Sequence, residues 1–332
     1  MTDTDTRREQ ALAWAQGVLG EDSSLGMLAG DASFRRYFRL SHAAKCYVLM
    51  DAPPGKEDVK PFLSVRAWMS DAGLRVPQLV AADESLGLLL LEDFGDVTWA
   101  VFLEQGGNVD ALMPDALRQL ALLQAIPQGV LADVGLPVFD VPRMQRECDL
   151  YLDWYLPYVA GENASPNERE NFHAALLPLL QELSDLPRTP VHLDYHSRNL
   201  MLPDDGLPLG VIDFQDAVYG PLSYDAASLL YDCYQNYPES MRRAYSLNFY
   251  STLGEGHRAS FSGFEDWHRL LRLTAMQRHI KAIGIFSRLA KRDGKTKFLE
   301  EIPLTRRHLR DEMAALGIEG EGFSLLLREA PL

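Results

Sequence analysis

Three residues with oxygen-bearing side chains, Asp194, Asn199 and Asp213, lie in two short polar clusters of one segment of the chain. Each cluster is flanked by a short apolar stretch typical of a strand, and the two halves predict a hairpin that brings the three side chains to one end. Phosphoryl transfer from ATP requires hard oxygen ligands for Mg²⁺ and a carboxylate directed at the attacking hydroxyl. The segment therefore predicts a site suited to ATP- and Mg²⁺-dependent phosphoryl transfer.

The order of residues around Asp194 resembles the catalytic loop of the aminoglycoside phosphotransferase and choline kinase family, whose members are distant relatives of protein kinases. The match is a His-x-Asp-x-x-x-x-Asn motif that ends at Asn199, followed by the strand-borne Asp213. By this resemblance, Asp194 is the catalytic base, and Asn199 and Asp213 bind Mg²⁺. His196 stands where the family has a histidine, which implies a contact with the transferred phosphoryl group. Asp225 matches a family aspartate that braces the loop.

Three other segments are similar to bacterial kinases that phosphorylate the anomeric (C1) hydroxyl of N-acetylmuramate and N-acetylglucosamine in cell-wall recycling, namely residues 32–38, 50–54 and 278–286. This similarity implies an amino-sugar acceptor. N-acetylmuramate carries a lactyl carboxylate, and an arginine fork is the best partner for a carboxylate. The candidate substrate contacts are Tyr195, Arg278 and His279.

Patterning predicts an α+β, protein-kinase-like fold with two lobes. The first lobe, residues 1–93, is expected to be a small antiparallel sheet with one crossing helix that covers the nucleotide. The second lobe, residues 94–332, is expected to be mainly helical and to carry the catalytic loop, the metal site and the sugar pocket. Its predicted helices lie near residues 110–125, 142–158, 166–185, 222–235, 239–253, 264–290 and 303–316.

Nucleotide recognition is expected in the first lobe, but Met50 stands where most family members carry a phosphate-binding lysine. Basic residues beside the neighbouring turn are candidates to neutralise the phosphates instead, namely Arg35, Arg36 and Lys45. Backbone amides in that turn are able to approach a phosphate, and backbone groups of the connector near residues 92–94 are candidates to bind adenine. The predicted nucleotide contacts are Ser33, Phe34, Arg35, Arg36, Glu92 and Phe94.

The missing lysine keeps two alternatives open. An aminoglycoside or choline kinase would need a carboxylate-lined pocket for its cationic substrate, whereas the C-terminal helix of this chain offers arginines. An ATP-binding pseudokinase would also lack the lysine, although it would have no reason to keep Asp194, Asn199 and Asp213. A protein kinase is disfavoured because no APE-like sequence follows Asp213.

The composition sets the broad class of protein. The 332 residues are 47% hydrophobic, which is enough for one large core or two. A formal net charge of −15 repels nucleic acids and anionic membranes. Three widely spaced cysteines without a CxxC pair favour a reducing compartment. Because the N-terminus is polar and no apolar run has membrane-spanning length, the chain is predicted to be cytoplasmic, with a small amino sugar as partner and an oligomeric state left open.

Overall fold

The computed structural model describes residues 3–30, 34–127, 129 and 135–329. The chain forms two compact units. The first comprises Met1–Thr98 and Leu200–Gln215, and the second comprises Trp99–Asn199 and Asp216–Leu332. A segment from the middle of the chain thus belongs to the first unit, and the division into lobes near residue 93 stays a prediction.

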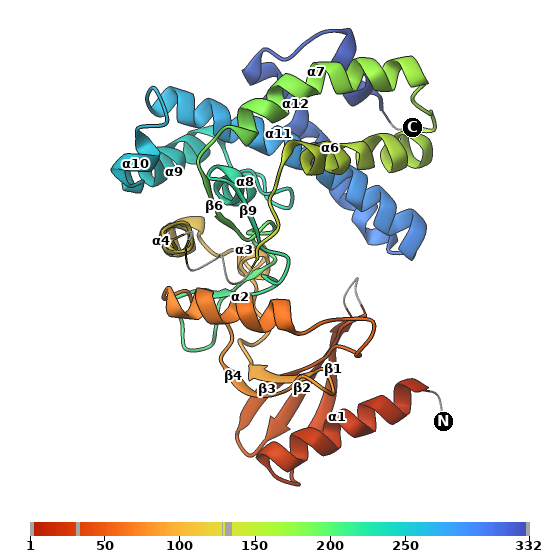
Figure 1. Cartoon of the computed structure of the whole chain (residues 1–332), viewed down its shortest axis with the longest axis vertical. Coiled ribbons are helices and arrows are strands. Elements are labelled where there is room, and N and C mark those ends of the chain that lie inside the picture. The colour runs from red at the N-terminus through yellow and green to blue at the C-terminus, as the bar shows by residue number, and fades with distance from the viewer. Residues whose placement is uncertain (1–2, 31–33, 128, 130–134, 330–332) are drawn as a thin grey trace. The chain divides into compact units, whose positions relative to one another are not determined.

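A five-stranded antiparallel sheet forms the centre of the first unit, with strand order β1-β2-β3-β5-β4 (Figure 1). Its strands are β1 (Ser24–Gly30), β2 (Arg36–His42), β3 (Lys45–Asp51), β4 (Leu79–Asp83) and β5 (Leu88–Glu92). Sequence patterning did not predict β1, because its glycines and alanine have low strand propensity. The predicted small antiparallel sheet is confirmed.

Two helices, α1 (Asp3–Leu19) and α2 (Lys60–Asp71), lie on opposite faces of this sheet (Figure 1). Phe38 of β2 and Leu49 of β3 belong to the apolar cluster that packs against α1. Since side chains alternate between the faces of a strand, Met50 points to the face opposite Leu49 and away from α1. Met50 is completely buried there.

A short hairpin of β7 (Leu200–Met201) and β8 (Gly210–Val211) completes the first unit. The Val211 N–H donates to the Arg75 carbonyl at 2.7 Å, which ties the hairpin to the segment after α2. A Cβ on Gly210 would lie 2.3 Å from the Phe94 ring, so the close approach of β8 to the connector requires glycine. This hairpin is the one predicted between the two polar clusters.

The second unit is mainly helical, as predicted, and contains one two-stranded ribbon of β6 (Arg188–Val191) and β9 (Val218–Pro221). Its α-helices are α3 (Trp99–Glu104), α4 (Val109–Gln124), α6 (Val141–Leu150), α7 (Pro166–Ser184), α8 (Tyr224–Leu230), α9 (Glu239–Thr252), α10 (Glu255–Arg258), α11 (Phe264–Asp293) and α12 (Ile302–Leu316). In the described part of the chain, no helix has the length and apolar character needed to cross a membrane.

The long helix α11 runs through the core of the second unit, and α6 continues into the π-helix η1 (Tyr151–Ala160) alongside it. At Gly284 of α11 a Cβ would come within 2.5 Å of the Tyr151 nitrogen, so glycine permits this contact. The remaining elements are the 3₁₀ helices η2 (Thr296–Glu301) and η3 (Glu321–Leu327).

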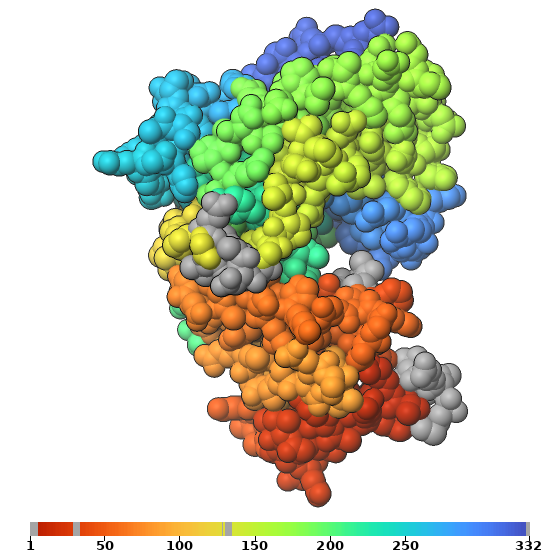
Figure 2. Space-filling model, viewed as in Figure 1, coloured from red at the N-terminus to blue at the C-terminus, as the bar shows by residue number. Residues whose placement is uncertain are grey.

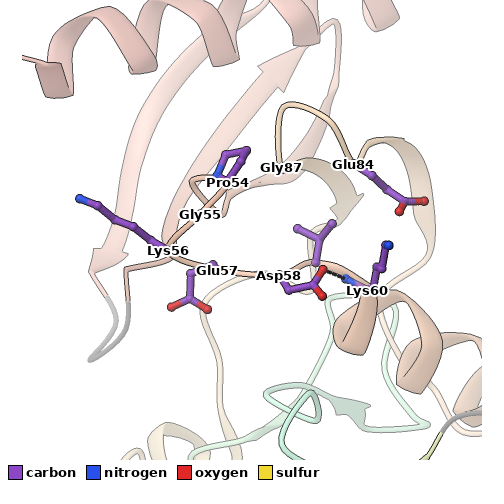
Figure 3. A pocket seen from close by; sticks show the side chains of 9 residues that line it. Pro54, Gly55, Lys56, Glu57, Asp58, Lys60, Glu84 and Gly87 are labelled. Carbon is purple, nitrogen blue, oxygen red and sulfur yellow. Dashed lines mark hydrogen bonds between the residues drawn. The ribbon is translucent and has the colours of Figure 1, made fainter.

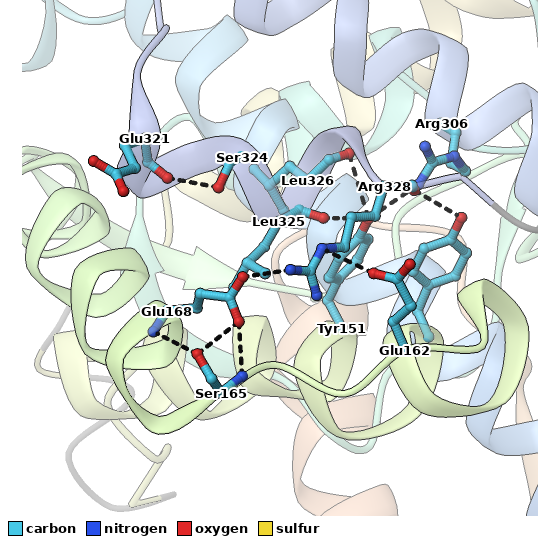
Figure 4. A network of polar contacts seen from close by, with 11 residues as sticks. Tyr151, Glu162, Ser165, Glu168, Arg306, Glu321, Ser324, Leu325, Leu326 and Arg328 are labelled. Atoms are coloured by element: carbon cyan, nitrogen blue, oxygen red, sulfur yellow. Dashed lines mark hydrogen bonds and ion pairs between the residues drawn. The ribbon is translucent and has the colours of Figure 1, made fainter.

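The C-terminal segment, blue in Figure 2, packs against α7, and polar contacts hold it in place (Figure 4). The Tyr151 hydroxyl lies 3.3 Å from the carbonyl oxygens of Leu325 and Leu326, and Arg306 donates to that hydroxyl at 3.0 Å. Arg328 forms an ion pair with Glu168 at the start of α7. These contacts assign η3 a structural role.

Candidate active site

The loop between β6 and β7 holds Asp194 and Asn199 together in the second unit. The Asn199 side-chain amide donates to the Asp194 carbonyl at 3.0 Å. The His196 N–H donates to the same carbonyl at 3.1 Å, and the Asn199 N–H donates to the His196 carbonyl at 2.9 Å. A tight turn therefore positions the three predicted side chains of this loop.

Two buried carboxylates brace this loop from either end. Asp225 accepts the N–H groups of His192 at 2.6 Å and Leu193 at 3.1 Å, which confirms its predicted bracing role. Asp232 accepts the Ser197 N–H at 2.9 Å. Burial raises the pKa of Asp225 to about 6, against the favourable effect of His192 and the two backbone donors.

Backbone strain also marks the candidate residues. Among the described residues, the non-glycine residues with positive φ are Ala43, Leu193 and Asp213. Leu193 directly precedes Asp194 and has φ of 78°, whereas Asp213 has φ of 64°. Such conformations cost about 1 to 3 kcal/mol and cluster at functional sites, where the surrounding structure maintains them. Two of the three therefore lie in the segment that the sequence selected.

Positive side chains surround the partly buried Asp194. Burial acts to raise its pKa, but the positive charges nearby, above all that of Lys281 and also that of Arg278, outweigh that effect and hold the pKa below its ordinary value. Burial lowers the pKa of His196, against the opposing effects of Asp232 and Asp194. Near neutral pH, Asp194 is therefore an ionised carboxylate and His196 a neutral imidazole.

Asp213 belongs to the first unit, where it follows β8. Its side chain accepts a hydrogen bond from Gln215 Nε2 at 2.8 Å. The next residue, Phe214, is fully buried, and its ring centroid lies 4.8 Å from that of Phe62 on α2. The packing of Phe214 thus anchors the chain immediately after Asp213.

The donor set of Asp213 and Asn199 suits Mg²⁺. One carboxylate and one amide supply hard oxygen atoms, and Mg²⁺ usually binds to one or two protein carboxylates together with substrate phosphates and water. Among the described residues, no group of three or more His, Cys, Asp or Glu side chains is arranged to hold a metal ion. Metal binding by Asn199 and Asp213 stays a prediction.

Three of the predicted nucleotide contacts lie in the turn directly before β2. Ser33 lies outside the described residues. The Phe34 N–H donates to Glu57 at 3.1 Å, and Arg35 Nε lies 3.3 Å from the other oxygen of the same carboxylate. Glu57 therefore holds both residues of the turn.

Glu57 also lines an open hollow of about 470 Å³ at the turn before α2 (Figure 3). Side chains of both charge signs line it, among them Lys56, Lys60 and Glu84. The hollow thus lies beside the segment that is predicted to cover the nucleotide, but its mixed charge selects no ligand.

Arg36 faces the α1 side of the sheet and pairs with the fully buried Asp51 directly opposite it on β3. Arg7 of α1 lies 2.6 Å from the other oxygen of Asp51. Because Met50 points to the opposite face, Arg36 does not occupy the position that a lysine at residue 50 would have. The structure therefore favours a structural role for Arg36.

The predicted connector contacts, Glu92 and Phe94, are held within the first unit. The Glu92 carboxylate accepts from Arg75 at 3.2 Å and from the Gln78 N–H at 3.1 Å. The Phe94 side chain is buried, and Arg75 lies over its ring at 5.3 Å from the centroid. Their side chains thus fix the connector, and adenine binding by its backbone groups stays a prediction.

Two of the three predicted substrate contacts are committed to packing. The buried Tyr195 hydroxyl donates to the Ala116 carbonyl at 2.8 Å. His279 is fully buried, with Nδ1 2.7 Å from Glu312 and Nε2 2.8 Å from the Tyr231 carbonyl. Since both ring nitrogens have partners, His279 offers none to a substrate. Arg278 differs, because its Nε is buried without a hydrogen-bond partner.

Sequence reasoning missed several residues that shape this region, among them Asp232, Lys281 and Glu147. Lys281 lies 3.4 Å from Glu147 on α6 and donates to the Tyr224 hydroxyl at 3.3 Å. The sequence assigns Lys281 no role. The missed signal is the mainly apolar run over residues 280–286 around it, which is typical of a buried helix segment.

The chain belongs to the phosphotransferase enzyme family, which its sequence matches over residues 26–270. This places the fold and the candidate site in a class of proteins that transfer phosphoryl groups. The predicted family membership is therefore confirmed.

Several curated relatives carry the name N-acetylmuramate/N-acetylglucosamine kinase. The Pseudomonas aeruginosa protein is 36% identical, over 94% of this chain and 96% of the relative. The Neisseria meningitidis protein is 37% identical, over 90% of this chain and 88% of the relative. The similarity thus extends over both units.

Solved structures of aminoglycoside phosphotransferases share the fold. A GDP complex of a 2′-phosphotransferase has a TM-score of 0.64 at 16% identity, covering 93% of this chain and 99% of that chain. A ternary complex of another such enzyme with AMP-PNP and hygromycin B has a TM-score of 0.59 at 16% identity, again covering 93% and 99%. The predicted protein-kinase-like fold is confirmed.

Proposed function

We propose that this enzyme transfers the γ-phosphoryl group of ATP to the anomeric hydroxyl of N-acetylmuramate and N-acetylglucosamine. The observation that carries the proposal is the similarity to kinases named for these two sugars over nearly the whole chain. The braced loop at Asp194 supports it, because this loop provides an ionised carboxylate where the family has its base.

In the proposed mechanism, Asp194 orients the acceptor hydroxyl and accepts its proton. The anomeric oxygen forms a bond to the γ-phosphorus while the bond from that phosphorus to the ADP oxygen breaks. An anomeric hydroxyl is more acidic than an ordinary alcohol, so a carboxylate of low pKa accepts its proton late in the transfer. The neutral His196, on the same turn, is proposed to contact the transferred group.

Asn199 and Asp213 are proposed to hold Mg²⁺, which neutralises phosphate charge and orients the nucleotide when bound. Asn199 directly precedes β7, and Asp213 comes two residues after Val211 of β8. The pairing of Leu200 with Val211 supports joint action of these two side chains. Asn199 and Asp213 thus flank the two strands of the hairpin that the sequence predicts.

The predicted nucleotide contacts remain part of the proposal, with one refinement. The turn at Ser33, Phe34 and Arg35 is proposed to cover the phosphates, and the connector backbone near Glu92 and Phe94 to bind adenine. Arg35 becomes the preferred cation for the phosphates, because the partner of Arg36 is a buried carboxylate on the α1 face. A cytoplasmic location is also proposed, since the reaction uses ATP.

Turnover of ATP with a panel of sugars tests this proposal. We expect ADP release with N-acetylmuramate and N-acetylglucosamine, and none with an aminoglycoside or choline. Release with a cationic acceptor alone would favour the first alternative. Nucleotide binding without turnover of any acceptor would favour the pseudokinase, for which Met50 is the main argument.

A further inference from the structure

Arg278 is a buried cation without a carboxylate partner in the part of the chain that the structure describes. Its exposed fraction is 7%, and its Nε is buried with no hydrogen-bond partner. The guanidinium lies over the Tyr224 ring, 5.3 Å from the centroid. A buried charge that lacks a partner is strongly destabilising, so its presence calls for an explanation.

Three other cations of the same helix are paired with carboxylates. Arg269 pairs with Glu182, Arg272 with Glu239, and Lys281 with Glu147. Arg272 resembles Arg278 closely, because it too lies over a tyrosine ring, that of Tyr231 at 5.8 Å. The two arginines thus differ in whether a carboxylate lies within ion-pair distance of the guanidinium.

The surroundings of Arg278 are connected to the catalytic loop. Tyr224, beneath the guanidinium, is followed by Asp225, which accepts the N–H groups of His192 and Leu193. Lys281, one turn further along α11, donates a hydrogen bond to the Tyr224 hydroxyl. Arg278 is also close enough to Asp194 to act on its charge. An anion bound to Arg278 would therefore lie on the acceptor side of the reaction.

We infer that Arg278 binds the carboxylate of an acid-bearing acceptor and so favours N-acetylmuramate over N-acetylglucosamine. The inference rests on the proposed function. A planar guanidinium binds a carboxylate with two parallel hydrogen bonds, and Lys281 is less suited because Glu147 already pairs with it. N-acetylglucosamine has a hydroxyl where N-acetylmuramate has the lactyl group, so only the latter gains this contact.

Comparison of kcat/KM for the two sugars in Arg278→Met and the wild type tests the inference. Loss of a charge-assisted contact is expected to lower the value for N-acetylmuramate by roughly 10- to 150-fold. The value for N-acetylglucosamine should fall much less, because this sugar loses only the effect of the Arg278 charge on Asp194, which both sugars share. The ratio of the two values is therefore the readout. Arg272→Met is the matched control and should leave the ratio of the two values unchanged.

Arg278→Lys provides a second variant, which keeps the charge but not the fork, and carries the test if Arg278→Met does not fold. A selective loss on N-acetylmuramate supports the inference in either variant. An equal loss on both sugars, as expected if Arg278 binds the transferred phosphoryl group, overturns it, and so does no loss on either. A wild-type enzyme inactive on both sugars would instead overturn the proposed function.

Discussion

Asp225 and Asp51 are both fully buried carboxylates, yet they stabilise different kinds of structure. Asp225 accepts two backbone N–H groups and thereby fixes the loop that presents Asp194. Asp51 pairs with the side chains of Arg7 and Arg36 and thereby fixes α1 to the sheet. The comparison indicates that a buried carboxylate braces the backbone of the Asp194 loop in the second unit. In the first unit a buried carboxylate instead pairs with Arg36, one of the candidates to replace the missing lysine.

The largest effect is expected at the catalytic loop. Asp194→Ala should lower turnover by roughly 10²- to 10⁴-fold, the usual contribution of a general base. Nucleotide affinity should change little, because the residue is proposed to orient the acceptor. Steady-state turnover and equilibrium ATP binding measure the two quantities. Turnover within about tenfold of the wild type would remove Asp194 from the role of base.

Asp213→Asn should separate the metal ligands from the base. Its turnover is expected to fall by about 10²- to 10³-fold, as for the loss of one group that stabilises developing charge. The Mg²⁺ concentration for half-maximal nucleotide binding should also rise, whereas Asn199→Ala should raise it less because an amide carries no charge. Titration of nucleotide binding with Mg²⁺ provides the measurement, and an unchanged dependence in Asp213→Asn contradicts its role.

Substitutions of Arg35 and Arg36 test whether these two neighbouring arginines serve nucleotide binding or stability. Arg35→Ala is expected to raise the KM for ATP and to lower kcat/KM by about 10- to 150-fold. Arg36→Ala should leave the KM unchanged and lower the free energy of unfolding by about 1 to 3 kcal/mol, because it removes one partner of the buried Asp51.

ATP titrations and urea unfolding distinguish these outcomes, with the exposed Arg8→Ala as a control that is expected to change neither. A raised KM in Arg36→Ala with normal stability would reverse the assignment. Wild-type behaviour of Arg35→Ala would leave Mg²⁺ as the main source of phosphate neutralisation.

The smallest expected effect is a shift in pH dependence. Lys281 is the largest of the positive influences that lower the pKa of Asp194. Removing its charge in Lys281→Met raises the pKa of Asp194, so the base becomes protonated at a higher pH. The acid limb of the pH profile of kcat/KM should therefore move to higher pH. The control Lys291→Met changes an exposed ammonium that lies over the Tyr158 ring and should leave the limb in place. An acid limb that stays in place in Lys281→Met would contradict this account of the charge around Asp194.

The catalytic loop was predictable from the sequence because its residues lie close together in the chain. The spacing from Asp194 to Asn199 reflects one turn, and Asp225 follows within the same segment. Alternation likewise predicted the sheet, except for the glycine-containing β1.

Other features depend on contacts between distant segments, which spacing does not encode. The sequence makes both Arg35 and Arg36 candidates to neutralise the phosphates, but only the packing of α1 shows which face of the sheet Arg36 occupies. His279 was a predicted substrate contact, but its two ring nitrogens contact Glu312 and the Tyr231 carbonyl, which lie far from it in the sequence. The burial of Arg278 and Lys281 depends on how α6 and α8 pack against α11.

The position of phosphate on the product is the most direct test of the central claim. The wild-type enzyme, incubated with ATP, Mg²⁺ and N-acetylglucosamine, is expected to give a sugar phosphate whose phosphorus couples to the anomeric proton in an NMR spectrum. Asp194→Ala serves as the control and should give no such signal above background. A product phosphorylated at any other hydroxyl, or ATP hydrolysis without a sugar phosphate, would contradict the assignment of an anomeric amino-sugar kinase.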